Sequence, residues 1–346
     1  MTASIELGPL DALLARHGLA GVPEEPFPND GWSGASMTLL RRGDGVRFVV
    51  KRDSLARDWI ATATADGPIL REAWFAARRL SLPAPIRAPY LGAAVDGTDG
   101  VAVLMPDLSG VLFDWAAPIP IEQLDRVLDG LAGLHASPWA ASGELEGGPW
   151  CPLRERVTLI CRPALERPGA ARDAVADRIL PGWDAFDRLA PPATRVLVDA
   201  LANDPAPLLD ALAALPATLL HGDLKLANVG LSEDGSIDLV DWQMVMVAPV
   251  AVELGWFLVS NVASLPLQPD DVLARYHEKA KQRGGADALG DWGAQSDAAI
   301  LVGLLLRGWR KGLDAEAGAV LPTGRTAVED LAWWSERALE AADRVL

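Results

Sequence analysis

Short strand-like apolar runs occupy much of the first third of the chain, and apolar positions follow a helical period over most of the rest. Two such runs flank Gly43-Asp44-Gly45, which is a turn sequence typical of a β-hairpin. Pro68 precedes a segment with helical spacing. Because proline is favoured at the first helical position, we expect a helix to begin there. The predicted strands are 37–42, 46–52, 88–95 and 101–105, and the predicted helical segments are 10–19 and 69–80.

Beyond Asp107 the pattern is mainly helical. Leucine and valine recur with a 3.6-residue period over 124–134, which indicates one buried helix face. A predicted hairpin, 228–231 with 237–242, interrupts the helices. The segment from Trp139 to Pro207 mixes prolines with helical pieces and gives no clear assignment. The closing helical stretches are 269–282, 290–313 and 326–346.

A β-rich beginning followed by a helical remainder predicts an α+β chain with two lobes and a cleft between them. We place the small β-rich N-lobe at 1–107 and the larger, mainly helical C-lobe at 108–346. The 346 residues are enough for two separate cores.

The net charge of −16 argues against a nucleic-acid partner, because phosphate backbones require clustered Lys and Arg. Such a surface either attracts a cationic substrate or serves solubility alone. The longest apolar run, Ala298–Leu306, is too short for a membrane span of about 20 residues. No secretory leader is apparent, and Cys151 and Cys161 lack a metal-ligand pattern. We expect a cytoplasmic protein with reduced thiols, although a local disulfide stays possible and the oligomeric state stays open.

The candidate chemistry lies in H-G-D-L-K-L-A-N, residues 221–228, and in the strand that ends at Asp241. Asp223, Asn228 and Asp241 follow one another at intervals of five and thirteen residues. Phosphoryl transfer needs one carboxylate at the acceptor hydroxyl and oxygen ligands that hold Mg²⁺ against the nucleotide phosphates. Each residue alone is more often a turn or cap residue, and only the combined order and spacing favours a kinase.

This segment resembles the protein-kinase pattern H-R-D-L-x-x-x-N followed by D-F-G. With His-Gly-Asp in place of His-Arg-Asp, it is most similar to the aminoglycoside phosphotransferase and choline kinase-like family, whose substrates are small. The resemblance implies a protein-kinase-like fold with Asp223 as catalytic base or orienter and with Asn228 and Asp241 as magnesium ligands. It also implies that Lys225 neutralises charge on the transferred phosphoryl group and that His221 supports the loop.

Lys51 is one of only five lysines and lies in a predicted strand. A kinase needs a lysine there for the nucleotide α and β phosphates, and a helix glutamate to hold it. Glu72, near the start of the following helix, is the expected partner. The alternative is an edge-strand lysine with a first-turn glutamate stabilised by the helix dipole.

Two further segments are candidate nucleotide contacts. Ser33 and Gly34 lie in G-W-S-G-A-S, which either covers the phosphates or is a plain surface loop. The resemblance places the hinge between the lobes at Met105, Pro106 and Leu108, with adenine held by main-chain groups of the last two. The expected nucleotide is ATP, with GTP not excluded, together with Mg²⁺.

The substrate is expected to be a small molecule with a hydroxyl, such as an aminoglycoside, an amino sugar, a choline-like alcohol or another metabolite. Only eleven residues separate Asp241 from Glu253, which lies in a predicted helix, and no Ala-Pro-Glu follows, so little chain is left to dock a polypeptide. Glu253 is expected either to brace the loop or to be an ordinary helix-start acid. Some of the thirteen tryptophans either line the acceptor pocket or only pack helices.

Two other functions compete with this one. An inactive nucleotide-binding pseudokinase would act as a sensor or scaffold, but Lys51, Asp223, Asn228 and Asp241 occur together here. A zinc hydrolase would need a set of ligands rich in His or Cys, and the four histidines are scattered.

Overall fold

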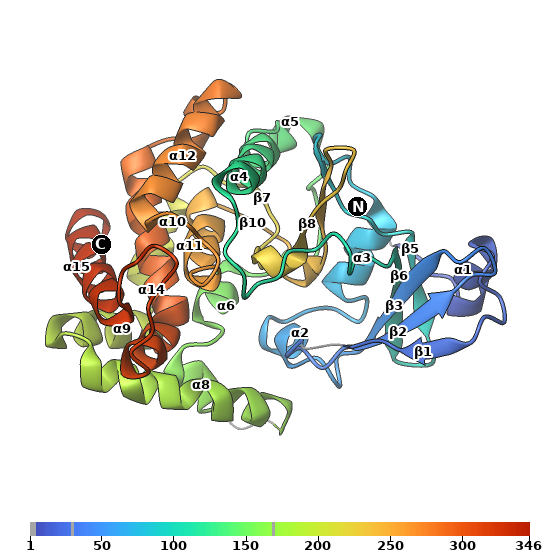
Figure 1. Ribbon diagram of the computed structural model, residues 1–346, viewed down its shortest axis with the longest axis horizontal. Coiled ribbons are helices and arrows are strands. Elements are labelled where there is room, and N and C mark those ends of the chain that lie inside the picture. Colours follow the sequence, from blue (N-terminus) through green and yellow to red (C-terminus); the bar gives the residue numbers. More distant parts are fainter. Residues whose placement is uncertain (1–4, 29–30, 168–169) are drawn as a thin grey trace.

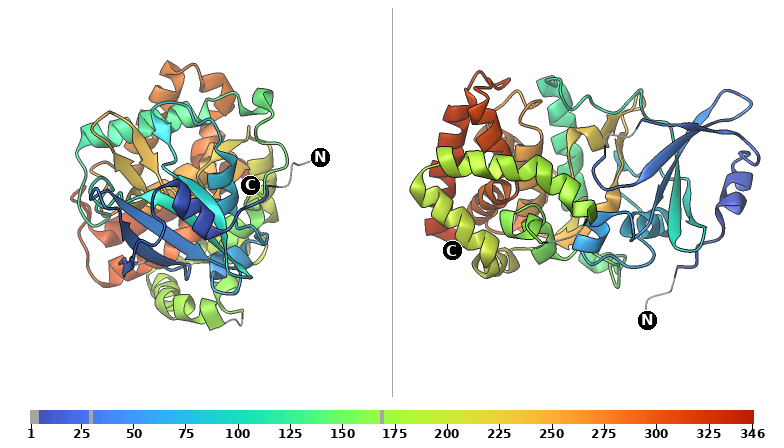
Figure 2. Two further views of the ribbon diagram at one scale, coloured as in Figure 1. Left: turned by 90° about the vertical axis from the view of Figure 1, so that its right-hand side faces the viewer. Right: turned by 90° about the horizontal axis from the view of Figure 1, so that it is seen from below.

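The computed structural model describes residues 5–28, 31–167 and 170–346. A small sheet-rich lobe and a larger helical lobe lie at opposite ends of the molecule (Figures 1 and 2). The predicted α+β, two-lobed architecture is confirmed.

The sheet of the N-lobe has the order β1-β2-β3-β6-β5, and all its neighbouring strands are antiparallel. The predicted hairpin is β2–β3, in which Leu40 pairs with Phe48 across the glycine turn. β1 was not predicted, because its three residues are all exposed and carry no apolar alternation. The strands are β1 (Glu24–Pro26), β2 (Ser36–Arg41), β3 (Arg47–Asp53), β5 (Gly92–Asp96) and β6 (Gly100–Pro106).

Both faces of this sheet are covered by a helix. Leu40, Phe48 and Val50 belong to the cluster that contains α1 (Leu10–Arg16), whereas Val49 belongs to the cluster that contains α3 (Arg71–Arg78). Successive side chains of a strand point to opposite faces, so Lys51 shares the face of Val49 and points toward α3. The strand pattern itself therefore directs the lysine toward Glu72.

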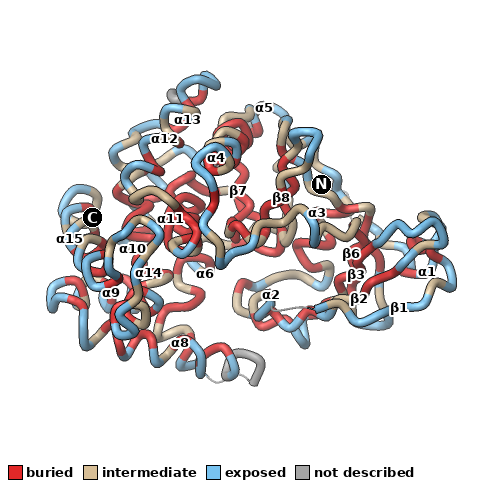
Figure 3. Tube along the Cα trace, viewed as in Figure 1, coloured by how far each residue is buried: buried red, intermediate tan, exposed pale blue. Residues whose placement is uncertain are grey.

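The C-lobe is built around α11 (Val250–Ser260) and α14 (Trp292–Glu316), which pack closely along each other. All residues of α11 from Val250 to Val259 are buried (Figure 3). The unassigned segment 139–207 folds mainly into short helices and the long helix α8. The remaining helices are α4 (Ile121–His135), α5 (Trp139–Ser142), α6 (Leu153–Thr158), α7 (Arg162–Leu165), α8 (Ala170–Leu189), α9 (Pro192–Asn203), α10 (Ala206–Ala213), α12 (Pro269–Gln282), α13 (Ala286–Leu289) and α15 (Ala327–Val345).

A two-stranded sheet and a short hairpin carry the candidate motif across the C-lobe. β7 (Thr218–Leu220) pairs with β10 (Met246–Ala248), and β8 (Val229–Leu231) pairs with β9 (Ile237–Leu239). The second strand of the predicted hairpin ends at Leu239 rather than Trp242. Its extension is stopped at Asp241, whose φ of 67° is left-handed and whose next residues form a 3₁₀ turn.

One strand of the N-terminal segment lies on the C-lobe. β4 (Ile86–Arg87) follows α3 and pairs in parallel with β9, and the Arg87 Nε atom lies 2.5 Å from the buried Asp238 carboxylate. The lobes are thus joined here as well as at the end of β6. The short helix α2 (Trp59–Ala63), capped by Asp58, was not predicted. Among the described residues, no helix is both long and apolar enough to cross a bilayer, and both cysteines are free and buried.

Candidate active site

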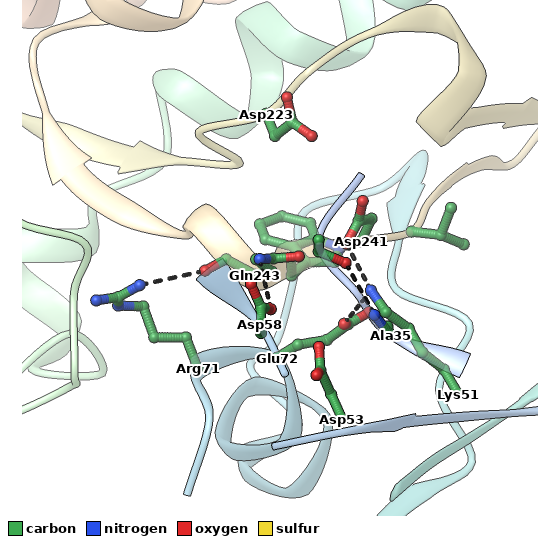
Figure 4. Close-up of polar contacts among 12 residues, drawn as sticks. Ala35, Lys51, Asp53, Asp58, Arg71, Glu72, Asp223, Asp241 and Gln243 are labelled. Atoms are coloured by element: carbon green, nitrogen blue, oxygen red, sulfur yellow. Dashed lines mark hydrogen bonds and ion pairs between the residues drawn. The ribbon is translucent and has the colours of Figure 1, made fainter. Parts of the chain in front are cut away.

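An ion-pair cluster joins β3, α3 and Asp241, which follows the β8–β9 hairpin (Figure 4). The Lys51 Nζ atom lies 2.6 Å from Glu72 Oε2 and 2.7 Å from Asp241 Oδ1. Lys51 and Glu72 are almost fully buried, and Asp241 keeps about a quarter of its side chain exposed, at 27%. Three residues that the sequence singled out separately are therefore in direct contact.

Burial and charge act in opposite directions on the acids of this cluster. Burial raises the pKa of Glu72, and the nearby Lys51 ammonium only partly offsets this. Burial would also raise the pKa of Asp241, but the charges of Lys51 and Lys225 outweigh it and lower that pKa to about 2. Asp241 is therefore a carboxylate at neutral pH, which a metal ligand must be.

Tyr90 connects the cluster and was missed from the sequence. Its hydroxyl donates to Glu72 Oε1 at 2.7 Å and accepts from the backbone N–H of Asp241 at 3.0 Å and of Trp242 at 3.3 Å. The residue lies between β4 and β5, outside every motif. No local signal in the sequence distinguishes it from an ordinary buried tyrosine.

More acids surround Lys51 than the sequence suggested. Asp53 and Asp58 lie beside the cluster, and Gln243 Nε2 donates to Asp58 Oδ2 at 2.8 Å (Figure 4). Burial and the neighbouring Asp53 carboxyl raise the pKa of Asp58 to about 8. Asp58 is therefore largely protonated at neutral pH and links α2 to the segment after Asp241.

The loop between β7 and β8 holds the other motif residues. The Lys225 Nζ atom lies 3.1 Å from Asp223 Oδ2, and Asn228 Nδ2 donates to the Asp223 carbonyl at 2.9 Å. Burial works against the charge of Lys225, but Asp223 and Asp241 outweigh it and raise the pKa of the ammonium. Lys225 therefore lies within electrostatic reach of both carboxylates, and Figure 4 shows Asp223 across from Asp241.

Backbone contacts hold this loop beside Asp241. The Val240 N–H donates to the Asn228 carbonyl at 3.0 Å, and the Val240 carbonyl lies 2.8 Å from His221 Nε2. Glu253 accepts from the N–H groups of His221 and Gly222 at 3.1 and 2.7 Å. His221 and Glu253 thus lie in loop-supporting positions.

Gly222 is required by geometry. Its φ is +83°, and a Cβ atom there would lie 1.9 Å from the Met244 carbonyl oxygen. No side chain fits so close an approach without a shift of the backbone. Glycine at this position lets the loop pack directly against the residues that follow Asp241.

The donor set suits a magnesium ion. Asn228 donates through Nδ2, while its amide oxygen accepts no hydrogen bond from the described part of the chain. Asp241 is bound to Lys51 through Oδ1, which leaves Oδ2 available. Amide and carboxylate oxygens are the ligands that Mg²⁺ prefers, so the residues present fit this ion.

The predicted adenine contacts lie at the end of β6. Met105 is buried, and Pro106 and Leu108 are partly exposed. The Leu108 carbonyl accepts from the N–H groups of Val111 and Leu112, so it is engaged in a turn. The Leu108 N–H has no partner among the residues described, so it is free to donate to a ligand.

The glycine-containing segment before β2 packs against α2. The Trp59 N–H donates to the Ser33 carbonyl at 3.3 Å, and a Cβ at Gly34 would lie 2.4 Å from the Arg57 carbonyl oxygen. Ala35, at the end of the segment, lies beside Lys51 and Asp241 (Figure 4). The segment therefore reaches the ion-pair cluster, and Ser33 and Gly34 fix its path.

This two-lobed fold, with a lysine–glutamate–aspartate cluster between its lobes, is of the protein-kinase-like class. The model of the phosphotransferase enzyme family, APH, matches residues 27–290, and the chain belongs to that family. A search of curated protein sequences returns no match.

Solved structures agree with this fold. The chain is 18% identical to a putative aminoglycoside phosphotransferase from Ralstonia eutropha, with a TM-score of 0.53 over 97% of this chain and 98% of the other. It is 14% identical to a spectinomycin phosphotransferase solved with ADP and spectinomycin, with a TM-score of 0.49 over 99% of both chains. At such identities the likeness concerns the fold alone, and here only the first comparison carries it.

Proposed function

We propose that this protein transfers the γ-phosphoryl group of ATP to a hydroxyl of a small molecule, with Mg²⁺. The observation that carries the proposal is the contact of Lys51 with both Glu72 and Asp241, beside a loop that presents Asp223 and Asn228. GTP as donor stays open. A small acceptor is favoured because only eleven residues separate Asp241 from Glu253, which leaves little chain to dock a polypeptide.

Each side chain has a role that follows from its position. Lys51, held by Glu72, contacts the α and β phosphates. Adenine is held by the Leu108 N–H, the Pro106 carbonyl and Met105.

Asp223 orients the acceptor hydroxyl and receives its proton, while Lys225 offsets charge on the transferred group. Asn228 and Asp241 would hold Mg²⁺, which neutralises phosphate charge when bound. Ser33 and Gly34 position the segment that closes over the phosphates.

The test is ADP release with Mg-ATP and a panel of hydroxyl compounds. Wild-type protein should show acceptor-stimulated release, and Asp223→Asn should lower the rate about 10²–10⁴-fold, because the hydroxyl loses its base. A nucleotide-induced rise in the melting temperature of the variant would show that its fold is intact. Equal rates in variant and wild type would refute the role of Asp223, and nucleotide binding without turnover would identify a pseudokinase.

A further inference from the structure

A group of unpaired hydrogen-bond donors lies in the C-lobe behind the catalytic loop. Side-chain N–H groups of two arginines and two tryptophans are buried and have no acceptor among the described residues. They come from α6, α11 and α14, which lie together in the C-lobe (Figure 1). The atoms are Arg156 Nη2, Trp256 Nε1, Arg307 Nε and Trp309 Nε1.

Trp256 is the centre of this donor cluster. The guanidinium of Arg156 lies 4.5 Å from its ring centroid and that of Arg307 lies 5.5 Å from it. Arg307 also lies 5.1 Å from the ring of Trp309. Arg156 is only 1% exposed, and Arg307, where the helical dihedrals of α14 break, is half-buried. The four side chains therefore form one connected group.

No carboxylate within the described ranges forms an ion pair with either guanidinium. The acids that act on them from farther away already have partners: Asp314 pairs with Arg310 at 2.9 Å, Asp223 pairs with Lys225 at 3.1 Å, and Glu253 accepts from the catalytic loop. Arg156 itself donates through Nε to the Gly222 carbonyl at 2.7 Å, which ties it to the loop. Burial lowers the pKa of Arg156 and lowers that of Arg307 to about 10, as it does for cations without a close counter-ion.

The cluster adjoins the catalytic loop beside Asp223. Arg156 donates to the carbonyl of Gly222, the residue before Asp223. In the proposed reaction the nucleotide phosphates lie beside Asp241 and the acceptor hydroxyl lies at Asp223. A partner for the arginines would therefore come with the molecule whose hydroxyl approaches Asp223.

The chemistry of the cluster selects that partner. Arginine and the indole N–H only donate hydrogen bonds, so none of the four groups can accept from another, and the two guanidinium charges repel a cationic ligand. Buried donors and charges are costly unless an acceptor-rich group meets them. We infer that the acceptor is a hydroxyl compound that also carries an anionic group, a carboxylate or a phosphate ester, bound through Arg307 and Arg156. This inference rests on the proposed phosphotransferase activity and narrows its substrate class.

A matched set of three-carbon compounds tests the inference: glycerol, cationic serinol, glycerate and glycerol 3-phosphate. With Mg-ATP, glycerate or glycerol 3-phosphate should stimulate ADP release by wild type more than serinol or glycerol does, and the better of the two distinguishes carboxylate from phosphate. Arg307→Met should raise KM for that anion about tenfold or more, because a charge-assisted contact is lost. Arg307→Lys should restore part of the affinity, and the KM for ATP should stay within about twofold.

Arg154→Met is the matched control, since Arg154 is exposed on α6, the helix that carries Arg156. Melting temperatures provide a readout without turnover: the anions should raise that of wild type and R154M but not that of R307M. Turnover that serinol stimulates best, with R307M unchanged, would overturn the inference and leave the proposed function standing. Anion binding lost in R307M, without ADP release by wild type, would overturn the function instead. No difference between wild type and R307M in either readout overturns the inference.

Discussion

Two regions near Asp223 carry opposite charge imbalances. In the acid-rich region, Lys51 is surrounded by acids, four of which are Asp53, Asp58, Glu72 and Asp241. In the second region, Arg156 and Arg307 have no acid within ion-pair distance in the described part of the chain. The acid-rich region balances its lysine with its own carboxylates. The second has no counter-charge of its own, so we expect the two regions to serve different parts of one reaction.

Of the variants that test this comparison, Lys51→Met should have the largest effect on stability and turnover. Glu72 and Asp241 would lose their cation, and a buried acid without its partner costs about 3 kcal/mol of stability. The turnover rate should fall about 10²–10³-fold, because the charge that holds the phosphates is gone. Steady-state kinetics and urea unfolding measure both, with the exposed Lys281→Met as control. A variant as active and as stable as wild type would contradict the role of the acid-rich region.

Gly222→Ala tests the residue that touches both regions, through the Asp241 segment and through Arg156. The new Cβ would collide with the Met244 carbonyl, so we expect a loss of about 2–3 kcal/mol and a large loss of activity. Gly235→Ala is a matched control: its φ is +88°, but nothing lies within 4 Å of its Cβ position. Equal losses of stability in both variants would show that φ, and not close packing, is the constraint.

Tyr90→Phe should have a smaller effect confined to the acid-rich region. The variant keeps the ring but loses the hydroxyl that bonds Glu72 and the Asp241 N–H. We expect a loss of about 1–2 kcal/mol in urea unfolding, because a buried charge-assisted bond is removed. The KM for ATP should rise, while the KM for the acceptor should not. A rise in the KM for the acceptor alone would contradict a role of Tyr90 in the acid-rich region.

The pH dependence of stability should show the protonated Asp58. Its pKa of about 8 lies above the ordinary value of 3.8, so its contribution is complete below about pH 4 and is lost as pH rises through 8. One such proton changes stability by at most about 1.4 kcal/mol per pH unit. Asp58→Asn should flatten the fall in urea stability between pH 6 and pH 9. An unchanged slope would show that Asp58 is ionised throughout.

The sequence was sufficient for the residues that lie in order along short segments. Asp223, Asn228 and Asp241 follow one another within one loop and one hairpin, and Lys51 lies in a strand that is followed by the helix that carries Glu72. The acid-rich surroundings and the donor cluster were not predictable in this way. Arg156 and Arg307 lie in helices far from the motif in sequence, and only packing brings them to the loop. The same holds for Tyr90, Asp58 and Gln243.

The pairing of β4 with β9 has a consequence for control of the enzyme. The chain leaves α3 and, within a few residues, pairs with β9, the strand that leads to Asp241, and Arg87 forms an ion pair with Asp238 there. This second connection restricts the movement of α3 relative to the C-lobe. We therefore expect Glu72 to stay in contact with Lys51 throughout the catalytic cycle, so that displacement of α3 does not switch activity off and the rate depends on the concentrations of the two substrates.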